Sequence, residues 1–362
     1  MLSRLTLRTA ARGLVAAGSA VLLLLTGAPA NSAPTPPTRF VQTDLVSGPD
    51  GAVGLVDANL VNAWGLALGP TSPLWVSNAG TATSTVYRGG VDGAPVALAL
   101  TVNIPGFGPT GQVFHDAAGD PTNFVISNGT VSAPSAFIFS TLAGDIVGWS
   151  GAVDRANGIV MAHVDGAVYT GLALWQTEFG PFLIATDFAN SRIDVFDGAF
   201  HRLPPAFFVD RSLPAGYRPF NVAVAGDAVY VAYAKAAPDG RSLAGRGLGV
   251  VNQFTDLGLT VRRVARGGTL NAPWGLAVAP ESFGTYAGAL LVGNFGDGLI
   301  GAYRGHRFVG LLRGTDHRPL RIEGLWALLP GTASTGGVNN VWFSAGPADE
   351  TRGLVGLISP AP

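Results

Sequence analysis

The sequence lacks cysteine, and it contains few charged residues. None of its 362 residues is a cysteine, and Asp, Glu, Lys and Arg together make up 12% of the chain. Without cysteine the protein has no disulfide bonds, no cysteine nucleophile and no site for lipid attachment at an N-terminal cysteine. Core packing and strand pairing must therefore stabilise the fold on their own.

Positive charge is also scarce. The formal net charge is −1, and Lys235 is the single lysine. Proteins that bind nucleic acid or anionic membranes usually present a broad basic surface. We therefore expect neither nucleic acid nor an anionic lipid surface to be a partner.

The apolar run at the N-terminus, residues 14–25, is shorter than the roughly 20 apolar residues that a membrane-spanning helix needs. It follows Arg4, Arg8 and Arg12 and precedes small residues that end at Ala30. This pattern is typical of a secretory signal peptide. We predict a signal peptide over residues 1–30, a Pro-rich linker over residues 31–38, and a secreted, extracellular protein with no membrane span after cleavage near Ala30.

Motifs for nucleophilic or zinc catalysis are missing as well. The sequence has no Gly-x-Ser-x-Gly elbow and no zinc-type pair of histidines. The five histidines are scattered, at positions 115, 163, 201, 306 and 317. No catalytic residue is assigned from the sequence.

Glycine and proline are abundant, with 51 and 25 residues, and hydrophobic residues make up 48% of the chain. This composition favours many short strands joined by tight turns. A short phrase also occurs twice, at residues 62–68 and 271–278, each time followed by a proline and two further apolar runs. An internal repeat of this kind indicates a repeat architecture.

From Asn62 onwards the chain divides into six units of roughly 45–60 residues, each with an inner run that begins near a glycine. The second runs are residues 74–78, 124–128, 182–187, 228–233, 290–294 and 341–344. The third runs are residues 85–88, 136–140, 192–197, 248–252, 300–304 and 354–359. The fourth runs are residues 96–102, 145–149, 206–209, 260–265 and 308–312. Six units of four strands predict an all-β fold: one domain over residues 39–362, a six-bladed β-propeller with four-stranded antiparallel blades.

The sixth unit has no fourth run, and residues 40–45 form an isolated strand candidate. We predict that this N-terminal strand completes the sixth blade and closes the ring, which removes an exposed sheet edge. The alternative is a frayed N-terminal arm. Residues 157–169 are expected to form an extra hairpin before the third blade, and residues 235–246 a polar loop in the fourth.

Several polar residues come just before the inner strands and are expected at the mouth of the central channel. They are Asn62, Thr110, Thr170, Asn221, Asn271 and Glu323. Carboxylate and amide oxygens suit Ca²⁺ or Mg²⁺, so Glu323, Asn62, Asn271 and Asn221 are candidate metal ligands. The alternative is that the asparagines hold loop backbone.

Aromatic residues open some of the inner strands. Thr110, Thr170, Trp64 and Trp274 are candidate ligand contacts, because Trp64, Trp274 and Trp326 could form the wall of a ligand funnel. The alternative is that these tryptophans pack between adjacent blades, where each ring buries a large apolar area.

Residues 183–197 resemble the NHL repeat, in which an Asp, an Asn and an Arg-Ile pair precede the third strand. Here these are Asp187, Asn190, Arg192 and Ile193. The resemblance implies a propeller, and Asp187 and Asn190 suit a tight turn.

Glu323 and the inner-strand asparagines are similar to the metal-holding positions of gluconolactonase-like propellers. The chain lacks the Asp of that family and carries its Glu in the last blade instead of the first.

Over residues 62–359 the chain resembles an uncharacterised family of secreted bacterial propellers, through residues 60–68, 73–87 and 271–280. That resemblance implies architecture and export but no substrate.

We predict that the protein is a monomer that binds an unknown extracellular small molecule or protein. The alternative function is a Ca²⁺- or Mg²⁺-dependent lactonase- or esterase-type hydrolase, whose cation would polarise a carbonyl and activate water at the channel mouth.

Overall fold

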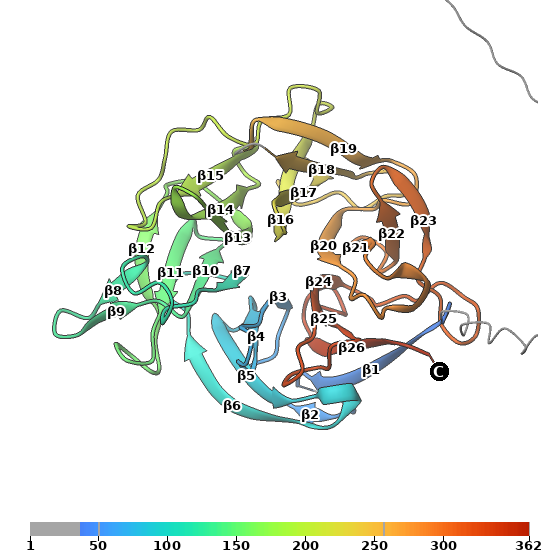
Figure 1. The fold of residues 1–362 in the computed structure, drawn as a ribbon, viewed down its shortest axis with the longest axis horizontal. Coiled ribbons are helices and arrows are strands. Elements are labelled where there is room, and N and C mark those ends of the chain that lie inside the picture. The colour runs from blue at the N-terminus through green and yellow to red at the C-terminus, as the bar shows by residue number, and fades with distance from the viewer. Residues whose placement is uncertain (1–36, 50, 256–257, 362) are drawn as a thin grey trace, which may run out of the picture. The chain divides into compact units, whose positions relative to one another are not determined.

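Six small sheets surround a central axis and form a β-propeller, as the computed structural model shows (Figure 1). The structure describes residues 37–49, 51–255 and 258–361. These residues form one compact unit, and the sheets follow one another around the ring in chain order. The predicted six-bladed propeller is confirmed. The signal peptide and most of the linker, predicted over residues 1–38, lie outside the described residues.

The first three blades take up the chain as far as Phe196. Blade 1 consists of β3 (Ala63–Ala67), β4 (Leu74–Asn78), β5 (Thr83–Gly89) and β6 (Val96–Asn103). Blade 2 consists of β7 (Pro109–Phe114), β10 (Phe137–Thr141), β11 (Asp145–Trp149) and β12 (Ile159–His163). Blade 3 consists of β13 (Tyr169–Thr177), β14 (Gly180–Asp187) and β15 (Arg192–Phe196).

The last three blades follow the same inner-to-outer order. Blade 4 consists of β16 (Tyr217–Ala225), β17 (Ala228–Lys235), β18 (Val250–Thr255) and β19 (Thr260–Arg266). Blade 5 consists of β20 (Pro273–Val278), β21 (Leu290–Asn294), β22 (Ile300–Arg304) and β23 (Arg307–Leu311). Blade 6 consists of β24 (Leu325–Pro330), β25 (Val341–Ala345), β26 (Leu354–Pro360), β1 (Phe40–Ser47) and β2 (Leu55–Val56).

The burial of each strand follows from its place in its blade. Every residue of β4, β10, β11 and β25 is buried, because both faces of a blade pack against its neighbours. The outer strands β6, β19 and β23 each carry two or more exposed residues. We call the face where the inner strands begin the upper face, and the face where they end the lower face.

The N-terminal strand closes the ring, as predicted. β1 pairs antiparallel with β26, from Phe40 opposite Pro360 to Ser47 opposite Leu354. Figure 1 shows β1 and β26 side by side, in blue and red. The prediction of four antiparallel strands per blade needs a correction here, because β2 adds a parallel fifth strand at Val46 and Ser47.

The predicted assignment of blade 2 is wrong by one strand. The sequence predicts the second strand of this blade at residues 124–128, which lie around β8 (Val125–Ser127). Among the described residues, β8 pairs only with β9 (Ser132–Pro134). β10 and β11 are the second and third strands, and β12 is the outer strand instead of part of an extra hairpin. Ile126 is buried among blade 2 and blade 3 side chains, which explains why this hairpin has the apolar composition of a blade strand.

Blade 3 has three strands among the described residues, so the predicted fourth strand at residues 206–209 is also wrong. Pro204 and Pro205 precede that segment and have no N–H group for a strand ladder. The segment packs instead as a loop, in which Phe208 contacts Trp175 and Phe254 with ring centroids 5.6 and 5.5 Å apart.

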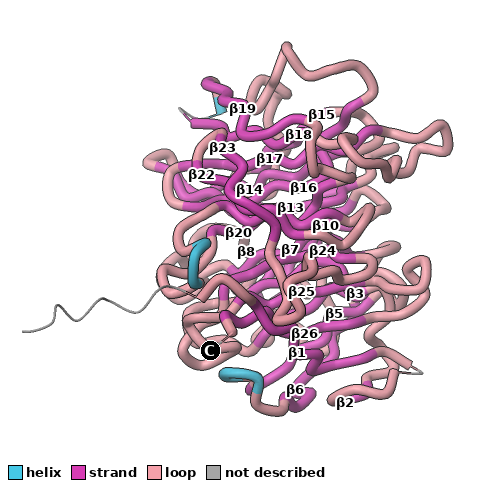
Figure 2. The backbone as a smooth tube through the Cα atoms, turned by 90° about the vertical axis from the view of Figure 1, so that its right-hand side faces the viewer, coloured by secondary structure: helices cyan, strands magenta, loops and turns pink. Residues whose placement is uncertain are grey.

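In the described residues, helical structure is limited to short 3₁₀ turns, such as η1 (Val91–Gly93) and η3 (Gly284–Tyr286). Figure 2 shows that strands and loops make up nearly all of the described chain. Within that part of the chain, no helix has the length and apolar character needed to cross a bilayer.

The NHL-like segment forms the tight turn that its residues predict. Asp187 accepts hydrogen bonds from the backbone N–H of Asn190 at 3.1 Å and from its side-chain amide at 2.7 Å. Arg192 pairs with Asp187 at 3.1 Å and with Asp194 at 2.8 Å. These contacts fix the connection between β14 and β15.

Candidate functional site

Every inner strand begins with an irregular pairing register. The shifts lie near the start of β3, β7, β13, β16, β20 and β24. The first residue left unpaired in each is, in blade order, Trp64, Thr110, Thr170, Phe220, Trp274 and Trp326. An extra residue of this kind turns its side chain away from the regular strand direction. Four of the six are aromatic and come together in the channel.

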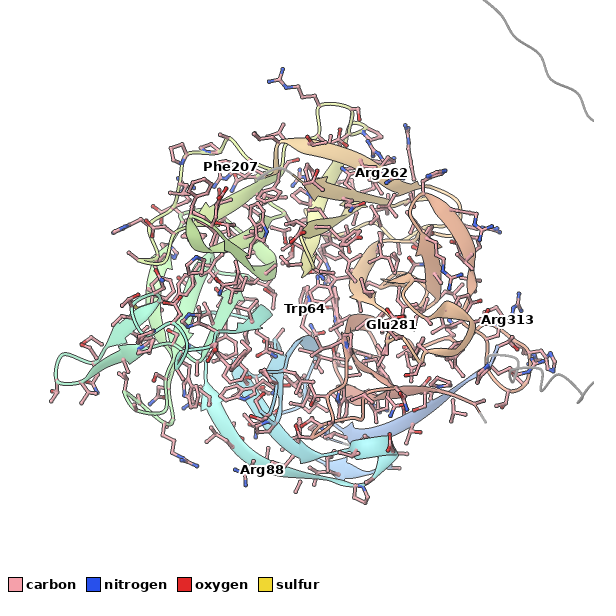
Figure 3. The ribbon with its side chains drawn as sticks, viewed as in Figure 1. Trp64, Arg88, Phe207, Arg262, Glu281 and Arg313 are labelled. Carbon is pink, nitrogen blue, oxygen red and sulfur yellow. The ribbon has the colours of Figure 1, made fainter. Side chains whose placement is uncertain are left out.

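These side chains form an aromatic cluster, which we define as Trp64, Phe188, Phe220, Trp274, Phe295 and Trp326. Trp326 is its centre: it stacks on Trp64 with centroids 3.7 Å apart and on Phe295 at 4.0 Å. Trp274 and Phe220 meet it edge-on at 5.8 and 5.9 Å. Figure 3 places Trp64 near the middle of the ring. The tryptophans therefore do more than pack between adjacent blades, because they fill the channel near the upper face.

Glycine follows the unpaired residue in most inner strands because the strands come very close together there. A methyl group at Gly65 would lie 2.2 Å from the carbonyl oxygen of Thr110, and one at Gly111 would lie 2.2 Å from the N atom of Leu172. Neither distance is possible for a real side chain. Glycine at this level thus permits the close packing around the cluster.

The predicted mouth residues occupy different levels of the channel. Asn62, Asn271 and Glu323 precede their inner strands, whereas Thr110 and Thr170 lie at the unpaired level. Asn221 lies one residue further in, where Gly65 and Gly111 stand in other blades. The six residues therefore do not form one ring.

The candidate metal ligands are engaged with other groups. Asn62 accepts a hydrogen bond from the indole N–H of Trp326 at 2.8 Å, and Asn271 accepts one from the backbone of Gly245 at 2.6 Å. The amide of Asn221 donates to the carbonyl of Trp274 at 2.8 Å, and Glu323 accepts from the backbone of Ala348 at 3.0 Å. Within the described ranges, no group of three or more His, Cys, Asp or Glu residues is arranged to hold a metal. The metal site stays a prediction.

The candidate ligand contacts Thr110, Thr170, Trp64 and Trp274 also differ in what surrounds them. The Thr110 hydroxyl donates to the carbonyl of Tyr169 at 2.7 Å, and both Thr110 and Thr170 are buried. Trp64 belongs to the aromatic cluster, whereas Trp274 also lines a cavity on the lower side of it.

An upper cavity of about 470 Å³ lies above the cluster, lined by Arg241, Phe295, Glu323, Asp349 and Glu350, among others. Arg241 forms an ion pair with Glu350, which also accepts a hydrogen bond from the Asn62 amide at 2.8 Å. A chain of polar contacts thus crosses this face from the loop after β17 to blade 6 and blade 1. The sequence did not indicate Asp349 or Glu350, since both lie in a loop outside the repeat.

A channel cavity of about 400 Å³ lies on the other side of the cluster, towards the lower face. All six inner strands contribute apolar side chains to its wall, including Leu66, Val113, Leu172, Val222, Leu276 and Leu328. Its few polar groups are Gln112, Asn221 and Tyr230. The amide of Gln112 donates to the carbonyls of Gly65 and Trp75 at 2.7 Å, so it is already satisfied.

An interblade cavity of about 290 Å³ adjoins the channel cavity between blades 4 and 5. The two share Tyr230, Val278 and Leu290 as lining residues. Burial raises the pKa of Tyr230, and the nearby charge of Arg262 opposes this effect only in part. Tyr230 therefore keeps its hydroxyl proton at neutral pH and can donate it.

The chain has close relatives among viral proteins. The uncharacterized protein R648 of Acanthamoeba polyphaga mimivirus is 32% identical over 343 residues, which cover 90% of this chain and 82% of R648. The uncharacterized protein L690 of the same virus is 30% identical over 342 residues, covering 90% and 88% of the two chains. The chain belongs to their family. No protein-family model matches it.

The fold is also similar to that of solved structures. A protein of unknown function from Bacteroides thetaiotaomicron superposes with a TM-score of 0.51 at 12% identity, over 89% of this chain and 77% of that one. A gluconolactonase from Xanthomonas campestris superposes with a TM-score of 0.38 at 16% identity, over 61% and 82%. The latter likeness is too distant to bear on substrate or reaction.

Proposed function

We propose that this protein is a ligand-binding module and that its binding site is the channel cavity. The ligand would be a small, mainly apolar molecule. With the predicted signal peptide, binding would take place outside the cytoplasm.

The observation that carries the proposal is the apolar wall of the channel cavity. Its volume of about 400 Å³ falls within the range of small-molecule sites. The rim residues Leu68, Leu174, Val224 and Leu329 remain partly exposed, although water is a poor environment for such side chains. A bound apolar molecule would remove this surface from water.

The aromatic cluster supports the same assignment. Because the cluster fills the channel above the cavity, the cavity is closed at its upper end and open towards the lower face. Trp274 lies at the boundary and lines the cavity. A ligand in the cavity would therefore contact an indole ring, which gives an intrinsic fluorescence signal for binding.

The test uses N-phenylnaphthylamine, a neutral apolar fluorophore, as the probe. We expect it to bind the parent protein with enhanced emission and to change tryptophan fluorescence. Ala225→Trp, at the partly exposed end of β16, places a large ring at the rim of the cavity and should lower the affinity at least about tenfold.

Ala97→Trp is the matched control, since Ala97 is an exposed residue of the outer strand β6. It should leave the affinity unchanged. If the parent does not bind the probe, or if both variants bind it like the parent, the channel cavity is not the site.

A further inference from the structure

The wall of the interblade cavity changes from apolar to cationic between the channel and the rim of the ring. On blade 4, strand pairing places Ala223 opposite Tyr230, Tyr230 opposite Gln253, and Gln253 opposite Arg262. Directly paired residues point to the same face of a sheet. These four side chains therefore form one row that runs from the inner strand to the outer strand.

Blade 5 presents a facing row. Val278 pairs with Leu290, and Leu290 pairs with Tyr303 on the next strand. All three line the interblade cavity, as do Tyr230 and Gln253 of blade 4. The inner parts of both rows are apolar, and Ala223, Val278 and Leu290 also line the channel cavity. The two cavities thus form one continuous site with an apolar inner end.

The outer end of this site carries positive charge. Arg304 lines the interblade cavity, and its guanidinium donates to the carbonyls of Thr285 and Ala287 at 3.2 and 3.0 Å. Arg262 reaches the same place from β19, since its Nη2 would lie 3.6 Å from a methyl group at Gly305, another lining residue. Figure 3 labels Arg262 on the outer side of blade 4.

No acidic residue in the described part of the chain forms an ion pair with either arginine. Glu281 lies beside the interblade cavity, because its Oε1 would lie 3.6 Å from a methyl group at the lining residue Gly288. The guanidinium of Arg262 also lies 3.5 Å from Nδ1 of His306, to which it can donate. Among the described residues, two guanidinium groups that form no ion pair therefore give this end of the site a positive potential.

We propose that the ligand is an amphiphile with an anionic head group, whose apolar chain occupies the channel cavity and whose head group lies between blades 4 and 5 at Arg262 and Arg304. The Tyr230 hydroxyl, which has no hydrogen-bond partner among the described residues, is a further donor along the path of the ligand. This proposal rests on the proposed function, because it requires the channel cavity to bind the apolar part.

The test measures displacement of N-phenylnaphthylamine by four ligands with the same ten-carbon chain, all below their micelle concentrations. Decanoate and decyl sulfate carry two different anionic heads, decanol is neutral, and decylamine is cationic. We expect the anions to bind about tenfold more tightly than decanol, and decylamine to bind more weakly than decanol. Added salt should reduce the advantage of the anions.

The double variant Arg262→Gln/Arg304→Gln should lower the affinity for the anions to that for decanol and leave decanol itself unaffected. Arg88→Gln, which removes an exposed arginine at the far end of β5 in blade 1, is the matched control and should change nothing. Glu281→Gln should tighten anion binding, because it removes the nearby negative charge.

The outcomes separate the two proposals. If none of the four ligands displaces the probe, the channel cavity does not bind apolar chains and the proposed function fails. If all four bind equally, or if the arginine variant binds anions like the parent, the head-group assignment fails while the channel site stands. Preference for only one of the two anions would identify the head group as carboxylate or sulfate and uphold the assignment.

Discussion

At the scale of single residues, the side chains around the channel mouth hold the aromatic cluster and the loops above it. Asn62 contacts both Trp326 and Glu350, and Glu323 binds the backbone of Ala348. Ala348, Asp349 and Glu350 have positive φ angles of 54°, 52° and 68°, which non-glycine residues rarely adopt. The contacts of Glu323 and Glu350 therefore stabilise a strained loop.

Replacing Glu323 with Gln tests the predicted cation site. Gln keeps an oxygen that can accept from Ala348, so we expect a change in unfolding free energy below about 1 kcal/mol. Since the amide oxygens of Asn62 and Asn271 and the Oε1 atom of Glu323 already accept hydrogen bonds, we expect no heat of Ca²⁺ or Mg²⁺ binding in calorimetric titrations of either protein. Binding in the parent that the Glu323→Gln variant lacks would instead establish the metal site and favour the hydrolase.

The position of the tryptophans at the start of the inner strands could be predicted from the repeat, but the direct contact between their rings could not. It depends on a register irregularity in each inner strand, and a sequence pattern carries no information on where pairing slips by one residue. The cationic end of the interblade cavity is even harder to predict from the sequence. Arg262 and Arg304 lie far apart along the chain and approach the same cavity only because blades 4 and 5 face each other.

At the scale of elements, the loop after β15 takes the place of a fourth strand in blade 3. Hydrogen bonds to Asp210 hold this loop in position. The carboxylate accepts hydrogen bonds from Arg263 at 2.7 Å, Asn252 at 3.0 Å and the Ser212 hydroxyl at 2.6 Å. Burial raises the pKa of Asp210, but the bonds from Ser212 and Asn252 and the charge of Arg263 outweigh it and hold the pKa below its usual value.

Asp210→Asn should therefore destabilise the protein by about 2 kcal/mol at neutral pH, because Arg263 loses its ionic partner. A carboxyl group with a lowered folded-state pKa contributes stability above its ordinary pKa of about 3.9, and that contribution disappears as the pH falls through the lower value. The difference in unfolding free energy between the parent and Asp210→Asn should therefore become smaller as the pH is lowered. Urea unfolding at a series of pH values measures it.

Asp227→Asn serves as the control, since Asp227 is exposed in the turn between β16 and β17. This substitution should leave the unfolding free energy unchanged at every pH. If the difference in unfolding free energy between the parent and Asp210→Asn does not depend on pH, the carboxylate charge does not stabilise the loop.

Strands with both faces buried were the easiest elements to predict. Residues 74–78 and 290–294 match β4 and β21 without adjustment, because burial between two blades requires a continuous apolar run. The same reasoning failed at residues 124–128, where a hairpin packed outside the blade has a similar composition. Local pattern reports burial, and it does not report which sheet a strand joins.

At the scale of the whole molecule, the ring depends on the pairing of its two chain ends. β1 gives blade 6 its fourth antiparallel strand and also contacts blade 5, where Phe40 lies 4.7 Å from Phe283 and 5.7 Å from Tyr286 between ring centroids. The backbone N–H of Phe40 donates to the carbonyl of Arg313 at 2.9 Å. The strand thus joins the first part of the chain to the last two blades at once.

Deleting residues 39–46 should remove this closure, leave β26 with an unpaired edge, and expose the pocket that Phe40 fills. Phe40 is 1% exposed, so Phe40→Ala alone should cost about 3–5 kcal/mol of unfolding free energy, and the deletion should cost more and promote aggregation through the open edge. Thermal unfolding and sedimentation velocity measure both effects. The control lacks only residues 31–36, upstream of the strand. If the deletion melts and sediments like that control, the ring is closed by contacts other than β1, and the sixth blade is stable without its outer strand.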